Sequence, residues 1–389
     1  MSKEKVTIIG PISDFGGIGV EVNTIAVSLE DSYDVTIIST NYMSEKAFAV
    51  QNLKLTRWVS IPRMVLSTHK VISILTAASR FWNRKKAPVD FRSYVENSVS
   101  KKIVDFDKLY LNHVYKELKD VKVVIVCAQV TYNYLSEIIQ FCHQNTIQVL
   151  VRTTETVKEM DVSKYQFLKK VSLFLHHSED NAQNLNKQIG EQLPYRIVDQ
   201  CVTMEGQLLN KPIGFQKPLR FGFLGRLVGN KNILPLARFF SQTEFPFVIA
   251  GVGNQLPELL EIIKGAPTCR YLGCIQNEAI VNFFEEIDVL IISSSYEAGP
   301  LVGLEAMAAG KLLLSTRVGA MADRLSGIDS FWFDIDDGTS LKERVNQLNR
   351  MSNFECANFA SKLRERYRDK YNFKYISSEY NKVVKLYMQ

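Results

Sequence analysis

The chain has 389 residues, of which 46 % are hydrophobic and 23 % are charged, with six cysteines and a net charge of +6. A chain of this length exceeds one ordinary hydrophobic core, so we expect two domains of roughly 200 residues each. No run approaches the roughly 18 apolar residues of a membrane-spanning helix. The cysteines form no CxxC pair, which gives no metal signature and favours free thiols in a reducing compartment.

The first predicted element is a buried strand at "KVTIIG", residues 5–10, whose apolar run is too short for a secretory signal. We therefore expect a cytoplasmic protein, with the inner face of the cell membrane as an alternative. The following "GPISDFGGIGVEV" contains Gly16, Gly17 and Gly19 before a helix that we expect to begin near Val20. A glycine-rich turn at this place is either a phosphate cradle or simply a tight turn.

A basic segment follows, because residues 54–102 contain eleven Lys and Arg against Asp90 and Glu96, a net +9. Such a segment faces an anionic partner: a membrane surface, a phosphorylated ligand or nucleic acid. Within it, one helical stripe is apolar, and Lys70, Ser73, Arg80 and Arg84 lie opposite. The stripe consists of Val71, Ile74, Leu75, Ala78, Phe81 and Trp82. We expect it to pack on the protein's own core, with peripheral contact of residues 70–92 with an anionic membrane as the alternative. Nucleic acid is not expected, since no reading motif is present.

Further Val- and Ile-rich runs in the first half predict parallel strands separated by helices. These runs are 34–40, 121–128, 146–153 and 172–178. At the end of the third, Arg152 and Glu155 are placed to meet a ligand, although a surface salt bridge is the favoured interpretation. At the end of the fourth, strand alternation sends only one of His176 and His177 towards a cleft, and a structural role is favoured for both.

The strand pattern restarts after a looser stretch that ends near residue 215. The runs of the second half are 219–225, 245–251, 269–273, 289–295, 311–316 and 331–334. The fold class is therefore α/β, with two doubly wound domains, 1–215 and 216–370. The C-terminal helix 371–389 can pack back on the first domain. Ligands of such sheets bind beyond the carboxyl ends of the strands, so the residues after each run are candidates for a site.

Three of these strand ends carry groups suited to an anion. After "LRFGFLG", Arg226 and Lys231 stand five residues apart on a turn that enters a helix, where both can converge on one anion. "VGN" follows the next strand as another glycine-containing turn. After "VLIISSS" comes "YEAGPLVGLEAMAAG", which predicts a helix from about 300 to 309 with Pro300 in its first turn and Gly310 at its end.

The helix at 300–309 places two carboxylates beside an anion site. Glu297 lies on the loop before it and Glu305 on the helix itself. The free N–H groups and the dipole of the helix start bind anions. Because carboxylates there would repel a phosphate, their natural partners are the vicinal hydroxyls of sugar rings. The arrangement predicts a phosphate with a sugar on either side.

Acidic residues Asp334, Asp336 and Asp337 close the last strand and precede "GTSL". Helix capping is favoured over a metal site for this group, so no metal ligand is assigned.

Together, "EAGPLVGLEAMAAG", "FLGRLVGNKN", "IAGVGN", "YLGCI" and the N-terminal "GGIG" resemble the retaining GT-B glycosyltransferases of family 4. The likeness covers nearly all of the second domain and the first strand and turn of the first. It implies two Rossmann-like domains facing a central cleft, 1–215 binding the acceptor and 216–370 binding the nucleotide sugar. It also implies a hexosyltransferase that acts on a glycan or lipid-linked saccharide in cell-surface polysaccharide synthesis.

The resemblance assigns roles to particular residues. Glu297 would hold hydroxyls of the donor sugar and Glu305 those of the ribose. Arg226 and Lys231 would neutralise the diphosphate with the backbone N–H groups of three further residues. Those three are Gly17, Leu301 and Val302, and the segment around Cys274 and Ile275 would contact the base. Gly299 and Pro300 stand where a Phe-Gly pair is common in the family, and by the resemblance this position would take part in recognising the donor sugar.

The implied reaction retains the anomeric configuration through an oxocarbenium-like state, with the diphosphate leaving on the same face. Cations and a helix N-terminus would stabilise the leaving group in place of a metal, and no cofactor is expected. Family members often carry a histidine after the middle strand of the first domain, where this chain has Thr153 or Thr154. This difference keeps open a non-catalytic sugar-nucleotide-binding protein, and the shared two-domain architecture keeps open a nucleotide-sugar epimerase.

Overall fold

The computed structural model describes residues 3–14, 16–84, 91–275, 279–328 and 330–388. It divides into two compact units. The first comprises Met1–His176, Ala182–Val198 and Ser377–Gln389, and the second comprises His177–Asn181 and Asp199–Ile376. The sequence analysis placed the division near residue 215, whereas the units divide after Val198, and the chain returns to the first unit at Ser377.

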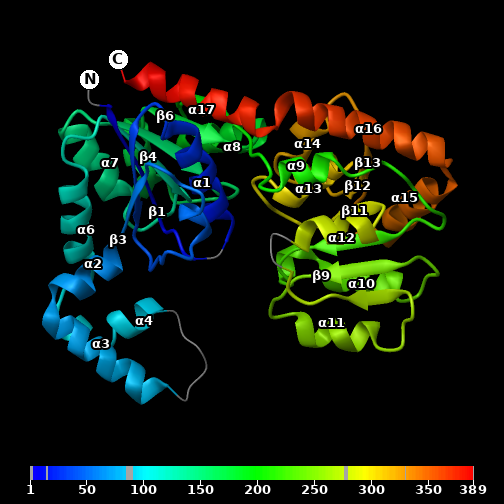
Figure 1. Ribbon diagram of the computed structural model, residues 1–389, viewed down its shortest axis with the longest axis horizontal. Coiled ribbons are helices and arrows are strands. Elements are labelled where there is room, and N and C mark those ends of the chain that lie inside the picture. The colour runs from blue at the N-terminus through cyan, green and yellow to red at the C-terminus, as the bar shows by residue number, and fades with distance from the viewer. Residues whose placement is uncertain (1–2, 15, 85–90, 276–278, 329, 389) are drawn as a thin grey trace. The chain divides into compact units, whose positions relative to one another are not determined.

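The first unit is built on a seven-stranded parallel sheet of order β3-β2-β1-β4-β5-β6-β7 (Figure 1). Its strands are β1 (Lys5–Gly10), β2 (Asp34–Ser39), β3 (Arg57–Ser60), β4 (Val123–Ala128), β5 (Gln148–Thr153), β6 (Leu173–His176) and β7 (Tyr195–Ile197). The central strand β4 is buried along its whole length and β5 at every residue after Gln148, as their Val-rich runs require in a sheet covered on both faces. The five strands predicted for this half are confirmed, and β3 and β7 are additional edge strands.

Helices connect these strands and cover the sheet. They are α1 (Gly17–Leu29), η1 (Phe48–Val50), α2 (Ile61–Thr68), α3 (Lys70–Asn83), α4 (Phe91–Val95), α5 (Ser100–Ile103), α6 (Phe106–Glu117), α7 (Leu135–Gln144), η2 (Val162–Lys170), α8 (Glu179–Ile189) and α17 (Phe373–Tyr387). The helix α1 begins at Gly17, three residues before the predicted start near Val20, with Gly16 as its N-cap at φ 122°. Such a φ favours glycine.

The second unit is a six-stranded parallel sheet of order β10-β9-β8-β11-β12-β13. Its elements are β8 (Phe221–Leu224), β9 (Phe247–Ala250), β10 (Cys269–Tyr271), β11 (Val289–Ile292), β12 (Leu312–Ser315), β13 (Phe331–Trp332), α9 (Glu205–Leu209), η3 (Gly229–Lys231), α10 (Ile233–Phe240), α11 (Leu256–Ile263), α12 (Ile280–Glu286), α13 (Leu301–Ala309), α14 (Met321–Arg324), α15 (Gly338–Arg350) and α16 (Asn353–Lys370). All six predicted strands of this half are present, and the doubly wound α/β class is confirmed.

The apolar stripe of α3 does not pack on the core of its unit as expected. The helix packs against α2 and α4 through a neighbouring face that buries Ile72 and Thr76. Of the stripe, Leu75 and Ala78 are half-buried, and Val71, Ile74, Phe81 and Trp82 lie in solvent. Figure 1 shows α3 and α4 set apart from the sheet of their unit. Among the described residues, no helix combines the length and the hydropathy needed to cross a bilayer.

A buried cluster fastens α17 to the first unit and involves Arg152, for which a surface salt bridge was favoured. That prediction is wrong, because Arg152 is fully buried and its Nε donates to Glu21 Oε1 at 2.9 Å. The hydroxyl of Tyr380 donates to the same oxygen at 2.5 Å, and a second nitrogen of Arg152 donates to the Val198 carbonyl. Burial raises the pKa of Tyr380 well above its usual value, so the phenol stays a donor.

His176 belongs to the same buried region. Its Nδ1 lies 2.9 Å from the Thr153 hydroxyl. Burial, with the nearby Arg152 charge, lowers the pKa of His176 to about 3, so the imidazole is neutral at ordinary pH. The favoured structural role of His176 agrees with these contacts.

We predict that Tyr380→Phe destabilises the protein by about 1–3 kcal/mol, because Glu21 loses a buried donor. The measurement is urea unfolding, with Tyr375→Phe on the exposed side of the same helix as the control. Equal midpoints for the two variants would contradict this account of how α17 is held.

Candidate functional site

The predicted site residues of the second unit flank the switch point of its sheet. In the order β10-β9-β8-β11-β12-β13, the neighbours β8 and β11 are the strands from which the chain winds in opposite directions. Doubly wound sheets bind ligands beyond the carboxyl ends of this pair. Arg226 and Lys231 follow β8, while Glu297 and α13 follow β11. The topology therefore gathers these predicted groups at one edge.

Backbone and side-chain hydrogen bonds fasten the two segments together. The Ser295 N–H donates to the Asn230 carbonyl at 2.9 Å, and the Ser293 hydroxyl donates to the Lys231 carbonyl at 2.6 Å. Asn232 takes the left-handed conformation, φ 52°, and its amide donates to the Ser293 carbonyl at 2.8 Å. Asparagine tolerates this conformation better than most residues. The η3 turn is thus fixed against the loop after β11.

This fastening brings Lys231 and Glu297 into a direct ion pair. Lys231 Nζ lies 2.5 Å from Glu297 Oε1, and both side chains are less than one-fifth exposed. The Ser294 hydroxyl donates to the same oxygen. Lys231 was predicted to bind the diphosphate and Glu297 the donor sugar of one ligand. In the structure, the two side chains form an ion pair with each other. A lysine ammonium keeps two further N–H donors in such a pair.

The helix α13 was predicted closely. It runs from Leu301 to Ala309, with Pro300 as its N-cap and Gly310 in the left-handed conformation, φ 63°, as its C-cap. The N–H groups of Leu301 and Val302 lie in the first turn, where no carbonyl of the same helix can accept from them. Both residues are half-buried. The start of α13 therefore presents donors near the Lys231–Glu297 pair.

Glu305 is the most unusual group of the site. Its side chain is buried, with 4 % exposure, and among the described residues it makes no hydrogen bond or ion pair. Burial raises the pKa of the Glu305 carboxyl from 4.5 to about 7. A buried carboxyl without a partner costs stability, and such groups mark functional sites.

A second buried ion pair orients the start of α13. Arg324 binds Asp199 through Nε at 2.8 Å and Nη2 at 2.6 Å, and its Nη1 donates to the Pro300 carbonyl at 2.6 Å. A Cβ on Gly299 would meet Arg324 Nη2 at 3.0 Å and His177 Cβ at 3.3 Å. Arg324 and Asp199 were not predicted as site residues, since no local pattern links residues 125 positions apart.

Two glycines of "IAGVGN" are required by close approach of the chain. Gly251 has φ 136°, and a Cβ there would collide with the Gly225 carbonyl. A Cβ on Gly253 would collide with the Leu227 carbonyl. This packing fixes the turn that carries Arg226, which is exposed and makes no hydrogen bond or ion pair with the residues that the structure describes.

The other predicted residues have these places. Gly17 is the first residue of α1 in the first unit, and a Cβ on it would meet open space. Its contact with a ligand of the second unit stays a prediction. Ile275 is half-buried against the core of the second unit, and Cys274 is exposed.

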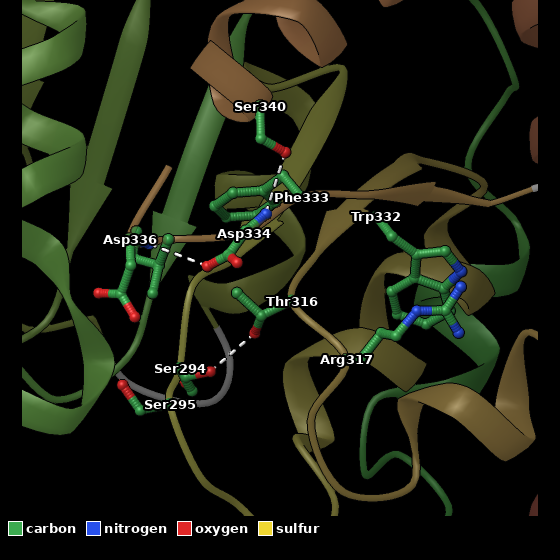
Figure 2. Close-up of a pocket in the computed structure, with 10 residues that line it drawn as sticks. Ser294, Ser295, Thr316, Arg317, Trp332, Phe333, Asp334, Asp336 and Ser340 are labelled. Carbon is green, nitrogen blue, oxygen red and sulfur yellow. Dashed lines mark hydrogen bonds between the residues drawn. The ribbon is translucent and has the colours of Figure 1, made fainter. Parts of the chain in front are cut away.

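A cavity of about 500 Å³ lies beyond β11, β12 and β13 (Figure 2). The Thr316 hydroxyl donates to the Ser294 carbonyl at 2.7 Å within it, so the cavity adjoins the segment that carries Glu297. On another wall, the Arg317 guanidinium lies 4.7 Å from the centre of the Trp332 ring. Polar groups and an aromatic wall suit a saccharide better than a lipid.

The acidic group after β13 has a structural role in capping. Asp337 is the N-cap of α15, and its carboxylate accepts from the Thr339 N–H at 2.9 Å. The favoured interpretation is confirmed for Asp337. Among the described residues, no three His, Cys, Asp or Glu side chains are grouped closely enough to hold a metal ion.

We predict that Glu305→Gln stabilises the free protein at about pH 8 by roughly 1–3 kcal/mol and has a much smaller effect at about pH 5. The pKa of Glu305 is raised on folding, so the folded state binds the proton more tightly. Its stability therefore falls as pH rises from 4.5 through about 7.

Thermal unfolding at both pH values measures this effect, with Glu258→Gln on an exposed helix face as the control. A difference between wild type and Glu305→Gln that does not change with pH would contradict the burial of an ionisable carboxyl.

Comparisons with known proteins bear on the fold and on one stretch of the sequence. Residues 218–350 match the family model described as "Glycosyl transferases group 1". No curated protein sequence matches the chain. Among solved structures, it resembles a glycosyltransferase from Rickettsia africae with TM-score 0.72 and 13 % identity, covering 100 % of both chains.

Two further structures are similar. HepE from Anabaena, in complex with UDP, has TM-score 0.71 and 11 % identity over 98 % of this chain and 99 % of that one. TarM from S. aureus, with fondaparinux, α-GlcNAc-glycerol and UDP, has TM-score 0.71 and 13 % identity over 99 % and 100 %. The chain has the GT-B fold of these structures, and its match to the family model is confined to residues 218–350.

Proposed function

We propose that this protein is a glycosyltransferase that moves a hexose from a nucleotide-diphosphate sugar to a saccharide or lipid-linked saccharide, with retention. The domain match at 218–350 and the UDP-bound HepE structure support a nucleotide-sugar donor, and we take its base to be uracil. TarM with saccharide ligands beside UDP supports a saccharide acceptor. We propose cell-surface polysaccharide synthesis as the pathway, and the cytoplasmic location stays a prediction.

One observation carries the proposal: the buried, unpartnered carboxyl of Glu305 lies on the helix whose first amides follow the Lys231–Glu297 pair. A free carboxyl beside cations and free N–H groups suits a ligand with hydroxyls next to phosphates. A nucleotide sugar has hydroxyls on both sides of its diphosphate. Glu305 would accept hydrogen bonds from the ribose and Glu297 from the donor sugar, and such bonds to an ionised group are strong.

The chemistry follows from where negative charge develops. As the bond to the anomeric carbon breaks, charge builds on the leaving diphosphate. Arg226, the two remaining N–H donors of Lys231 and the amides of Leu301 and Val302 would stabilise it. A preorganised donor of this kind lowers a barrier by about 3 kcal/mol, so no metal is needed in this proposal.

Glu297 has two tasks in this scheme. It fixes Lys231 through Oε1, and its remaining lone pairs can orient the donor sugar. The Arg324–Asp199 pair acts through the Pro300 carbonyl, so both residues are positioning residues. In this scheme Glu297 and Lys231 contact the donor, whereas Arg324 and Asp199 orient the start of α13.

The first experiment is a thermal-shift panel of UDP-, GDP- and ADP-glucose, since ligand binding to the native state raises its stability by mass action. We expect UDP-glucose to give the largest shift. Incubation with saccharide acceptors then separates the remaining functions: UDP release that requires an acceptor supports a transferase. An isomerised sugar nucleotide would instead identify an epimerase. Binding without turnover of any acceptor tested would identify a sugar-nucleotide-binding protein.

We predict that Lys231→Ala lowers kcat/KM by at least about 100-fold, because it removes a donor that acts on the leaving group. Lys264→Ala, which changes an exposed lysine of the same unit, should stay near the wild-type value. Circular dichroism checks that both variants fold. Wild-type turnover by Lys231→Ala would overturn the assignment of this residue.

A further inference from the structure

The helix α3 has two apolar sides, and its unit covers only one of them. Ile72 and Thr76 face inwards with 3 % and 4 % exposure. Val71, Ile74, Phe81 and Trp82 form the other side and are between 60 % and 79 % exposed. We call these four residues the outer face of α3. Single exposed apolar side chains are common on proteins, but four large ones on one helix face form a patch that needs a partner.

The outer face is a continuous strip rather than a scatter of residues. Its first and last members are eleven positions apart, which corresponds to about 16 Å along a helix. The half-buried Leu75 and Ala78 fill the space between its members. The Asn97 side chain donates to the Leu75 carbonyl at 3.4 Å and fastens the chain before α5 to this helix. Two further exposed apolar side chains, Val99 and Ile103, follow within six residues.

Cations border this strip. Lys70 and Arg80 are exposed on α3, and Arg84 is exposed at its C-cap. The Arg84 guanidinium lies 4.2 Å from the centre of the Phe81 ring, so a charge and an aromatic side chain occupy the same end of the strip. Long basic side chains lay their stems on apolar surface and keep their charges at its polar edge.

Acidic side chains do not balance these cations. Glu96 is the sole acid of the described parts of the basic segment, 54–84 and 91–102. It is paired with Arg92 and with Lys101, the latter at 3.7 Å. Among the described residues, Lys70, Arg80 and Arg84 therefore have no ion-pair partner, and α3 also carries exposed apolar side chains.

We propose that the outer face of α3 docks in the interface of an anionic lipid bilayer. An interfacial helix places Trp, Phe and aliphatic side chains at the boundary between headgroups and acyl chains and directs Lys and Arg to the headgroups. Each cation near an anionic surface adds attraction that salt screens. Nucleic acid does not need the aliphatic strip, and an acidic protein would need an apolar groove of matching length. The inference does not rest on the proposed transferase activity.

The test is flotation of the full-length protein with vesicles, independent of any turnover. We expect retention on vesicles of phosphatidylglycerol and phosphatidylcholine, a fall in retention with added salt, and little retention on phosphatidylcholine alone. Phe81→Asp with Trp82→Asp should lower retention at least about tenfold, since two aromatic side chains no longer leave water. Both residues are exposed, so the variant should fold.

The matched control is Phe354→Asp, which changes an exposed aromatic residue of the second unit and should float like wild type. A second readout uses Trp58→Phe with Trp332→Phe, which leaves Trp82 as the remaining tryptophan. Its emission should shift to the blue on anionic vesicles. Absence of flotation, equal flotation on both lipids, or undiminished flotation of the double Asp variant would each overturn the proposal. So would a Trp82-dependent dimer that ignores vesicles.

Discussion

The burial of the Glu305 carboxyl is the constraint on which the account of the site depends. A carboxyl with 4 % exposure and no partner among the described residues keeps a pKa of about 7, at a cost in stability that the fold carries elsewhere. The packing of the surrounding strands and helices offsets this loss of stability. Both sheets are buried parallel cores, and α13 is packed along its length except at its first turn. A stable scaffold can hold one strained group where a ligand relieves it.

The groups around Glu305 are held by interactions of different range. Hydrogen bonds between η3 and the loop after β11 are local to the switch point and place Lys231 against Glu297. The Arg324–Asp199 pair reaches across 125 residues to fix the Pro300 carbonyl. Mutating a local contact and mutating the distant pair should therefore affect the same helix start. Mutating Lys231 or Glu297 changes the charge that meets the ligand. Mutating Arg324 or Asp199 changes the orientation of the first turn of α13.

Local patterns allowed much of this to be predicted from the sequence. Unbroken Val and Ile runs identify β4 and β11, and Pro300 and Gly310 mark the ends of α13 to within a residue. Short edge strands such as β7 lack such runs and were missed. The partners of Arg152 and Arg324 were also missed, because a charged residue at a strand or helix end has the same local pattern whether it is exposed or buried in a pair.

In the basic segment, too, the sequence pattern predicted a local feature but not how that feature packs. Periodicity identified the apolar stripe of α3 correctly, yet the helix turns Ile72 inwards and leaves Phe81 and Trp82 in solvent. A hydrophobic period in the sequence shows that a helix has an apolar face, but it does not show which face neighbouring elements cover, and here α2 and α4 cover the face with Ile72.

The most direct measurement for the whole account is a crystal structure of the protein with UDP-glucose. The account predicts ribose hydroxyls within hydrogen-bond distance of Glu305 and the diphosphate beside Lys231 and the first turn of α13. A nucleotide bound elsewhere, with the Glu305 carboxyl still unpartnered, would contradict it.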